Sequence, residues 1–103
     1  MKIVYIVGPY RSKKGINGIV NNIMKAEKVA IKYWKLGYAV ICPHMNTALM
    51  DGTGTDDMFL AGDREIIKRV DIIVVMKKWK TSKGSIAEIE LAKKLNKDII
   101  YDN

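Results

Sequence analysis

The sequence predicts an α/β fold: one parallel sheet of about four strands with helices on both faces, in a Rossmann- or flavodoxin-like arrangement. Two observations carry this prediction. Short apolar runs, typical of strands buried on both faces of a parallel sheet, alternate with longer segments of helical periodicity. With right-handed crossovers, this alternating order gives a parallel sheet covered on both faces. At 103 residues the chain has room for one core, so residues 1–103 are expected to form a single domain.

The first predicted strand is the nearly continuous apolar run 2–7, which Gly8 and Pro9 end. Tyr5 lies inside this run, so its side chain is expected in the core with a hydrogen-bond partner for its hydroxyl. Arg11 follows in the loop at the carboxyl end of the strand, where open α/β sheets bind ligands. Two roles stay open for Arg11: a fork that holds a phosphate, or an ordinary solvated arginine.

A helix is predicted over residues 17–36, and Gly37 closes it. Its inward stripe is made of side chains at helical spacing: Ile19, Ile23, Ala26, Ala30 and Tyr33. A second short strand follows over residues 38–42. These elements form the first strand–helix–strand crossover.

The region after the second strand is expected to be irregular. His44 is predicted to be a hydrogen-bonded structural histidine rather than a base or a phosphate contact. Segment 46–55 is expected to be a flexible loop and a candidate lid. Its Gly52-x-Gly54 has no strand before it, so it is not a dinucleotide-binding fingerprint.

Segment 56–69 has helical periodicity, and its apolar arc contains an acid. Asp63 falls inside this arc, among Phe59, Leu60, Ile66 and Ile67. The helix is not polar all round, because its other charged side chains occupy the opposite side: Arg64, Glu65, Lys68 and Arg69. A third buried strand is predicted over residues 70–76, and a fourth over residues 97–101.

The last predicted helix runs to Leu95 from a polar turn, and Glu88 projects into the middle of its apolar arc. A buried carboxylate must be hydrogen-bonded, paired, or raised in pKa. One interpretation is a capping box, in which Ser85 caps the helix and Glu88 reaches back to it. The other is a catalytic carboxylate in a cleft, with the N–H groups of the turn 82–85 facing an anionic substrate.

The net charge of +7 would suit a nucleic-acid partner, but most lysines lie at the helical spacing of a solvated face. The exception is a group that precedes the last helix and can attract a phosphorylated small molecule: Lys77, Lys78, Lys80 and Lys83. No nucleic-acid-binding motif is recognised and the aromatic residues are dispersed, so nucleic acid is not the expected partner. A single cysteine and a single histidine exclude an internal disulfide and a metal-ligand cluster. We expect no metal, no cofactor, no membrane span and a cytoplasmic location.

Several of these residues together resemble the nucleoside 2-deoxyribosyltransferase superfamily, which includes the 2'-deoxynucleoside 5'-phosphate N-hydrolases. The resemblance covers nearly the whole chain. It rests on Tyr5-x-x-Gly8, on Arg11 three residues later, on Asp63 eight residues before Asp71, and on Ser82-x-Gly84-x-x-x-Glu88. Two departures are Pro9, where the hydrolases can offer a serine, and an end at Asn103, before the segment by which relatives complete a neighbour's site.

The resemblance implies a role for each of these residues. Glu88 would be the nucleophile, Tyr5 would orient it, and Asp63 would assist at the sugar or the leaving base. Arg11 and Ser82 match positions that hold the 5'-phosphate in the hydrolases. The residues expected to bind the substrate are Gly8, Arg11, Ser82, Gly84 and Ser85.

The function expected from these roles is cleavage of the N-glycosidic bond of 2'-deoxynucleoside 5'-monophosphates. The alternatives are a deoxyribosyltransferase that acts on free nucleosides and a non-catalytic nucleotide-binding or sensing module. A homodimer or higher homo-oligomer is expected, because a small core leaves apolar side chains such as Trp34, Trp79 and Tyr101 in need of cover.

Overall fold

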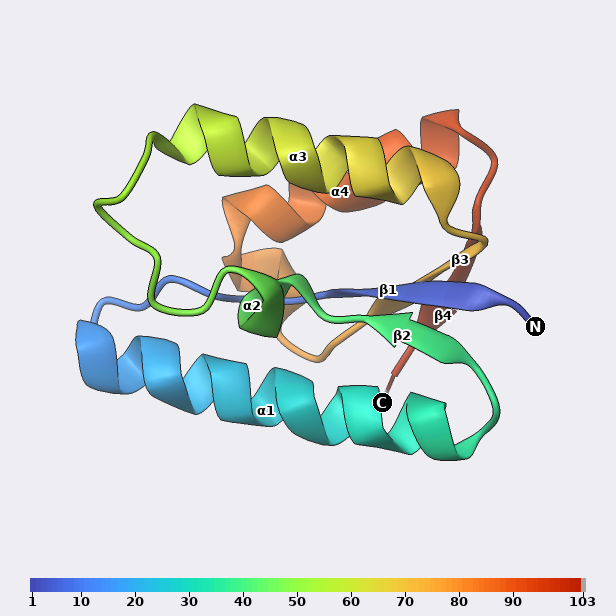
Figure 1. The fold of residues 1–103 in the computed structure, drawn as a ribbon, viewed down its shortest axis with the longest axis horizontal. Helices are drawn as coiled ribbons and strands as arrows, with labels where there is room; N and C mark the ends of the chain where they lie inside the picture. The colour runs from blue at the N-terminus through green and yellow to red at the C-terminus, as the bar shows by residue number, and fades with distance from the viewer. Residues whose placement is uncertain (103) are drawn as a thin grey trace.

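The computed structural model describes residues 1–102, which form one parallel sheet between two helical layers (Figure 1). The strand order is β2-β1-β3-β4. The strands are β1 (Ile3–Val7), β2 (Ala39–Ile41), β3 (Ile72–Val75) and β4 (Asp98–Tyr101). The helices are α1 (Ile16–Lys35), the short α2 (Pro43–Asn46), α3 (Asp56–Arg69) and α4 (Lys83–Lys94), with a 3-10 turn η1 (Trp79–Thr81) before α4. The predicted fold class is confirmed.

The two faces of the sheet carry separate cores, because alternate residues of a strand point to opposite faces. On the first face, β1 and β3 pack against α1 through Val4, Ile6, Ile72, Val74, Ala26, Ala30 and Tyr33. On the second face, they pack against α3 and α4 through Tyr5, Val7, Ile73, Val75, Ile67, Ile89 and Ala92. Figure 1 shows α1 on one side of the sheet and α3 and α4 together on the other. Tyr5 therefore faces the layer that also contains Asp63 and Glu88.

All strands are parallel, so their carboxyl ends meet at one end of the sheet. At that end the chain passes from β1 to α1, from β2 through α2 to α3, and from β3 through η1 to α4. Figure 1 shows these connections gathered at the left-hand end. The end of the sheet that commonly binds ligands is therefore built from residues 8–15, 42–55 and 76–82.

The element boundaries agree with the sequence prediction to within a few residues. The apolar arcs of α3 and α4 are narrower than expected. Leu60 is 40% exposed and Leu95 is 38% exposed, so neither is a core residue. The short helix α2 was not predicted; Pro43 stands at its first turn, where a missing N–H costs nothing. Within residues 1–102, the helices are all too short or too polar to cross a membrane.

Candidate active site

The centre of the candidate site is a hydrogen bond between β1 and α4. The Tyr5 hydroxyl donates to Oε2 of Glu88 at 2.6 Å. Tyr5 is completely buried, and Glu88 is partly exposed. The sequence predicts a hydrogen-bond partner for the Tyr5 hydroxyl and places the Glu88 carboxylate on the apolar arc of its helix. The structure pairs these two groups.

The start of α4 decides between the two interpretations of Glu88, and the capping box is wrong. Ser82 is the N-cap: its hydroxyl accepts from the Ser85 amide at 3.2 Å, and α4 begins at Lys83. Ser82 takes the extended backbone typical of a cap because η1 ends there, whereas Ser85 is already helical. Glu88 consequently lies one turn too far along α4 to reach the cap. Its carboxylate points to the sheet.

The environment of Glu88 raises its pKa to about 7 from an ordinary 4.5. Burial is the largest cause, and electrostatic repulsion from Asp63 adds to it. The hydrogen bond from Tyr5 and the nearby charge of Arg64 act in the opposite direction. Glu88 therefore exchanges its proton near neutral pH, as a catalytic carboxyl group does.

Asp63 joins this pair from α3. Its pKa is raised by burial, and its charge raises the pKa of both Tyr5 and Glu88. Among the described residues, no hydrogen bond or salt bridge of the Asp63 side chain is found. The pKa of Tyr5 is also raised, by burial first and then by Glu88, so Tyr5 keeps its proton and remains a donor. The three residues predicted to be catalytic thus form one electrostatically coupled group.

Gly8 is required by packing at the end of β1. A Cβ at this position would come within 2.5 Å of the Met76 sulfur, which lies at the end of the neighbouring strand β3. The carbonyl oxygens of Gly8 and Pro9 each lie 3.0 Å from Nε2 of His44. His44 is 4% exposed, and burial lowers its pKa, so it is the neutral, structural histidine that the sequence predicted.

Arg11 is neither a free phosphate fork nor a simply solvated side chain. Its guanidinium lies 2.7 Å from Asp56 and 3.4 Å from Asp51, and its side chain is 59% exposed. Tyr10 joins this group, because its hydroxyl donates to Asp51 at 3.2 Å and accepts from the Leu49 amide at 3.3 Å. Sequence reasoning missed Tyr10, Asp51 and Asp56, since exposed side chains leave no periodic signal.

The start of α4 is open above Gly84. A Cβ there would meet only the Ser82 hydroxyl, at 4.0 Å. The Ser82 hydroxyl accepts from Ser85 and keeps its own proton for a ligand. Ser85 itself is buried, and its hydroxyl has no partner within residues 1–102. Ser82 and Gly84 are thus placed to contact an anion, whereas Ser85 is in the core.

Two grooves are found whose lining residues do not include Tyr5 or Glu88. One, of about 570 Å³, runs beside the edge strand β2 and is lined by Ala30, Trp34, Val40, Ile41, Cys42, Met45, Asn46 and Ile66. The other, of about 250 Å³, lies at the ends of β3 and β4 and is lined by Val75, Met76, Lys77, Lys78, Trp79, Lys80 and Tyr101.

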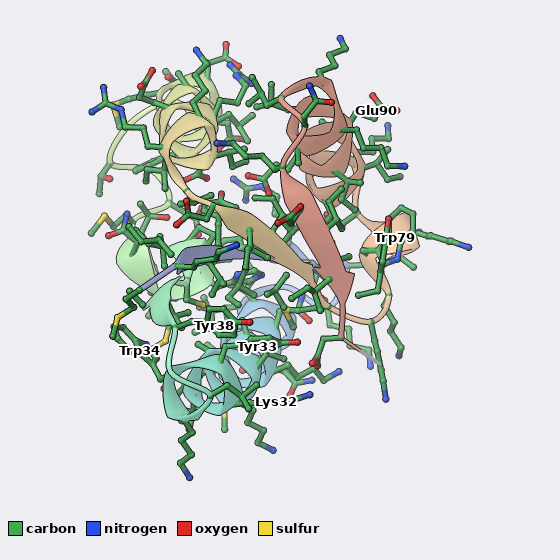
Figure 2. The ribbon with its side chains drawn as sticks, turned by 90° about the vertical axis from the view of Figure 1, so that its right-hand side faces the viewer. Lys32, Tyr33, Trp34, Tyr38, Trp79 and Glu90 are labelled. Atoms are coloured by element: carbon green, nitrogen blue, oxygen red, sulfur yellow. The ribbon has the colours of Figure 1, made fainter. Side chains whose placement is uncertain are left out.

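Trp79 is half-buried against Tyr101, with ring centroids 5.9 Å apart, so it needs less cover than expected. Figure 2 shows Trp34 and Trp79 on opposite sides of the molecule.

Comparison with known proteins places the chain in a family and gives its fold relatives. A family described as a domain of unknown function, DUF4406, matches residues 2–101. No curated protein matches the sequence. Among solved structures, a 2-deoxyribosyltransferase from Bacillus psychrosaccharolyticus aligns with a TM-score of 0.67 and 21% identity, over 96% of this chain and 70% of its own.

Two further solved structures have the same fold. A 2-deoxyribosyltransferase from Leishmania mexicana has a TM-score of 0.68 and 17% identity, over 98% of this chain and 63% of its own. A conserved protein from Enterococcus faecalis V583 has a TM-score of 0.64 and 20% identity, over 98% of this chain and 62% of its own. The chain therefore spans about two thirds of these proteins. The expected resemblance to the 2-deoxyribosyltransferases is confirmed at the level of the fold.

Proposed function

This chain belongs to the DUF4406 family, and we propose that it cleaves the N-glycosidic bond of 2'-deoxynucleotides with Glu88 as the nucleophile. The observation that carries this proposal is the 2.6 Å hydrogen bond from the buried Tyr5 to Glu88. A binding module has no need of a carboxylate in an apolar layer, where its charge is costly. The 2-deoxyribosyltransferase fold supports the same conclusion.

The proposed reaction begins when the Glu88 carboxylate attacks C1' of the deoxyribose. The bond between C1' and the base nitrogen breaks as a glycosyl ester to Glu88 forms, and the leaving base takes the electron pair of the broken bond. We assign to Asp63, whose pKa burial raises, the transfer of a proton to the departing base. Water or a second base then attacks C1' as its proton passes to the ionised Asp63, and the ester bond to Glu88 breaks with its electron pair returning to the carboxylate, which gives hydrolysis or transfer.

Tyr5 has two effects in this scheme. Its hydrogen bond fixes the carboxylate oxygen Oε2 and leaves the other oxygen of Glu88 available for attack. It also lowers the pKa of Glu88 and so increases the ionised fraction near neutral pH. Tyr5 is a suitable donor because its own pKa is far too high for it to lose its proton.

We propose nucleoside 5'-monophosphates as the substrates. Arg11 and the first turn of α4 lie at the same end of the sheet, and both favour an anion. The Ser82 hydroxyl and the free N–H groups of the turn containing Gly84 would hold phosphate oxygens. The exposed lysines Lys77, Lys78, Lys80 and Lys83 add a positive field around this turn.

A transferase that acts on free nucleosides is the second candidate. One observation favours it: the charge of Arg11 is already balanced by Asp51 and Asp56, so a phosphate must compete for it. The names of two structural relatives point the same way. A non-catalytic nucleotide-binding module is the third candidate, with the same surface and no turnover.

One experiment separates these candidates. The protein is incubated with each deoxynucleoside 5'-monophosphate and each free deoxynucleoside, with and without an acceptor base, and the released base is measured by chromatography. Base release from monophosphates without an acceptor supports the hydrolase. Transfer from free nucleosides supports the second candidate, and no release from any substrate contradicts catalysis.

We also propose that the active form is a homo-oligomer. A core of this size leaves large apolar side chains at the surface, which a second copy would cover. Trp34 is 55% exposed beside the open edge strand β2, where another copy would cover it. Light scattering at micromolar concentration tests this proposal, and a monomer would contradict it.

A further inference from the structure

The segment 47–55, between α2 and α3, is attached to the rest of the molecule in an unusual way. Among the described residues, its hydrogen bonds beyond its immediate neighbours, and those of Asp56 after it, all end on Tyr10 or Arg11. Its remaining hydrogen bonds are local turns such as Met50 to Thr47. Within residues 1–102, two adjacent side chains thus make the hydrogen bonds of the segment other than its local turns and the local bonds that join its ends to α2 and α3.

The loop that carries these two side chains is itself firmly held. The Asn22 side chain donates to the carbonyl oxygens of Tyr10 at 3.0 Å and of Arg11 at 3.4 Å, which ties the loop to α1. The buried His44 lies at hydrogen-bond distance from the carbonyls of the two preceding residues. Tyr10 and Arg11 thus extend from a fixed loop, and segment 47–55 is the part that can move.

Segment 47–55 has the features of a segment that opens at low cost. Most of its residues are exposed, and Leu49 and Met50 are 57% and 43% exposed, so little apolar surface holds it down. Leu49 adopts a positive φ of 59°, which is strained for a residue with a β-carbon. Gly52, at φ 84°, supplies a second flexible position. Asp56 stays favourably placed without Arg11, because it lies in the first turn of α3.

We propose that segment 47–55 is a lid held shut by Arg11, and that an incoming 5'-phosphate opens it by taking Arg11 from Asp51 and Asp56. The phosphate carries more negative charge than either carboxylate and offers the guanidinium a bidentate contact. Because an exposed ion pair contributes little by itself, the loss of the contacts to Asp51 and Asp56 costs little. The proposal rests on the monophosphate substrate proposed above, and it makes Asp51 and Asp56 determinants of specificity for the 5' end.

The test is limited proteolysis with thermolysin, which cuts at apolar residues such as Leu49 and Met50, followed by mass spectrometry. Without ligand, the Asp51→Asn/Asp56→Asn variant is expected to be cut in segment 47–55 about two- to tenfold faster than the wild type. Glu65→Gln is the matched control, since Glu65 forms an exposed pair with Arg69 at 2.9 Å, far along α3. That control should leave the rate unchanged.

Ligand dependence is measured in a Glu88→Gln background, so that the nucleotide is not consumed. dCMP should accelerate cleavage of the segment severalfold, deoxycytidine should not, and Asp51→Asn/Asp56→Asn added to the same background should abolish the response. Protection by dCMP, or no response to it, would overturn the lid. If no nucleotide releases base but dCMP still accelerates cleavage, the proposed chemistry fails while the lid stands. If base is released but dCMP does not change the cleavage rate of segment 47–55, the lid fails while the proposed chemistry stands.

Discussion

The buried polar group of the candidate site and the exposed polar group around Arg11 differ in how they are built. The Tyr5–Glu88–Asp63 group joins one strand and two helices inside an apolar layer, and its pKa values are raised mainly by burial. The Arg11–Asp51–Asp56 group joins the loop after β1 to segment 47–55 and to the start of α3, and its side chains are between 40% and 69% exposed. A buried group is fixed by packing and suits chemistry, whereas an exposed group can exchange partners and suits recognition. The following predictions test this division.

The largest effect is expected for Glu88→Ala, which should lower kcat at least about a thousandfold, because the nucleophile itself is removed. The fold should survive, since the cap of α4 is Ser82 and the change removes a buried acid. Glu90→Ala is the matched control: Glu90 is exposed on the same helix and lies on its outer side in Figure 2. Activity and circular dichroism are the measurements. Wild-type activity in Glu88→Ala would rule out the nucleophile.

The second prediction concerns stability and pH. The folded-state pKa of Glu88, about 7, is above its ordinary value of 4.5, so folding favours the protonated form. The contribution of protonated Glu88 to the free energy of unfolding is fully present below pH 4.5 and is lost as the pH rises through 7. Glu88→Gln should therefore be more stable than the wild type by about 3 kcal/mol at pH 8 and about equal to it at pH 4.5. Urea unfolding at the two pH values measures the difference, and a constant difference would contradict the raised pKa.

How far the sequence predicts this molecule depends on burial. Glu88 and Asp63 can be found in advance because a charge on an apolar arc breaks a periodic pattern, and Tyr5 because a phenol in a strand needs a partner. Arg11 was found from its place in the loop after the first strand and from the resemblance. Its partners Asp51 and Asp56 lie 40 and 45 residues away in the chain, and exposed residues carry no pattern that could identify them.

The start of α4 shows a different limit. Ser82 and Ser85 are equally good cap residues, and only Ser85 is followed by a glutamate three residues later, as a capping box requires. The backbone of the preceding 3-10 turn makes the choice, because it leaves Ser82 extended. That turn was not predicted from the sequence, so the capping box was a reasonable hypothesis with the wrong serine.

Tyr5→Phe tests the buried group with a smaller change. The variant loses the hydrogen bond that lowers the pKa of Glu88, so that pKa should rise further above 7. A hydrogen bond to a charged group contributes about 1.5 to 3 kcal/mol, which corresponds to a shift of about one to two pH units. The rising limb of the pH–rate profile should move to higher pH, and activity at pH 7 should fall about tenfold or more.

The control for Tyr5→Phe is Tyr33→Phe. Tyr33 also donates to a carboxylate, Asp102 at 3.1 Å, but on the opposite face of the sheet. In Figure 2 it lies beside Tyr38, and the two rings are 6.0 Å apart. Its loss should leave the pH profile unchanged. An unshifted profile in Tyr5→Phe would show that Tyr5 only fills space.

The smallest effect on chemistry is expected for Arg11→Ala, which tests the exposed group. A charge-assisted contact to a 5'-phosphate should be lost, so kcat/KM for monophosphates should fall about tenfold. Because Arg11 is mostly exposed and must first leave Asp51 and Asp56, a much larger loss is not expected. The matching free nucleosides should be processed at an unchanged rate, since they have no group for Arg11 to hold.

An equal loss of kcat/KM for nucleosides and monophosphates would place Arg11 with the buried catalytic group. The division between a buried group for catalysis and an exposed group for recognition would then be wrong. If the wild type processes both substrates equally well, the phosphate site is wrong and a transferase acting on free nucleosides becomes the better description.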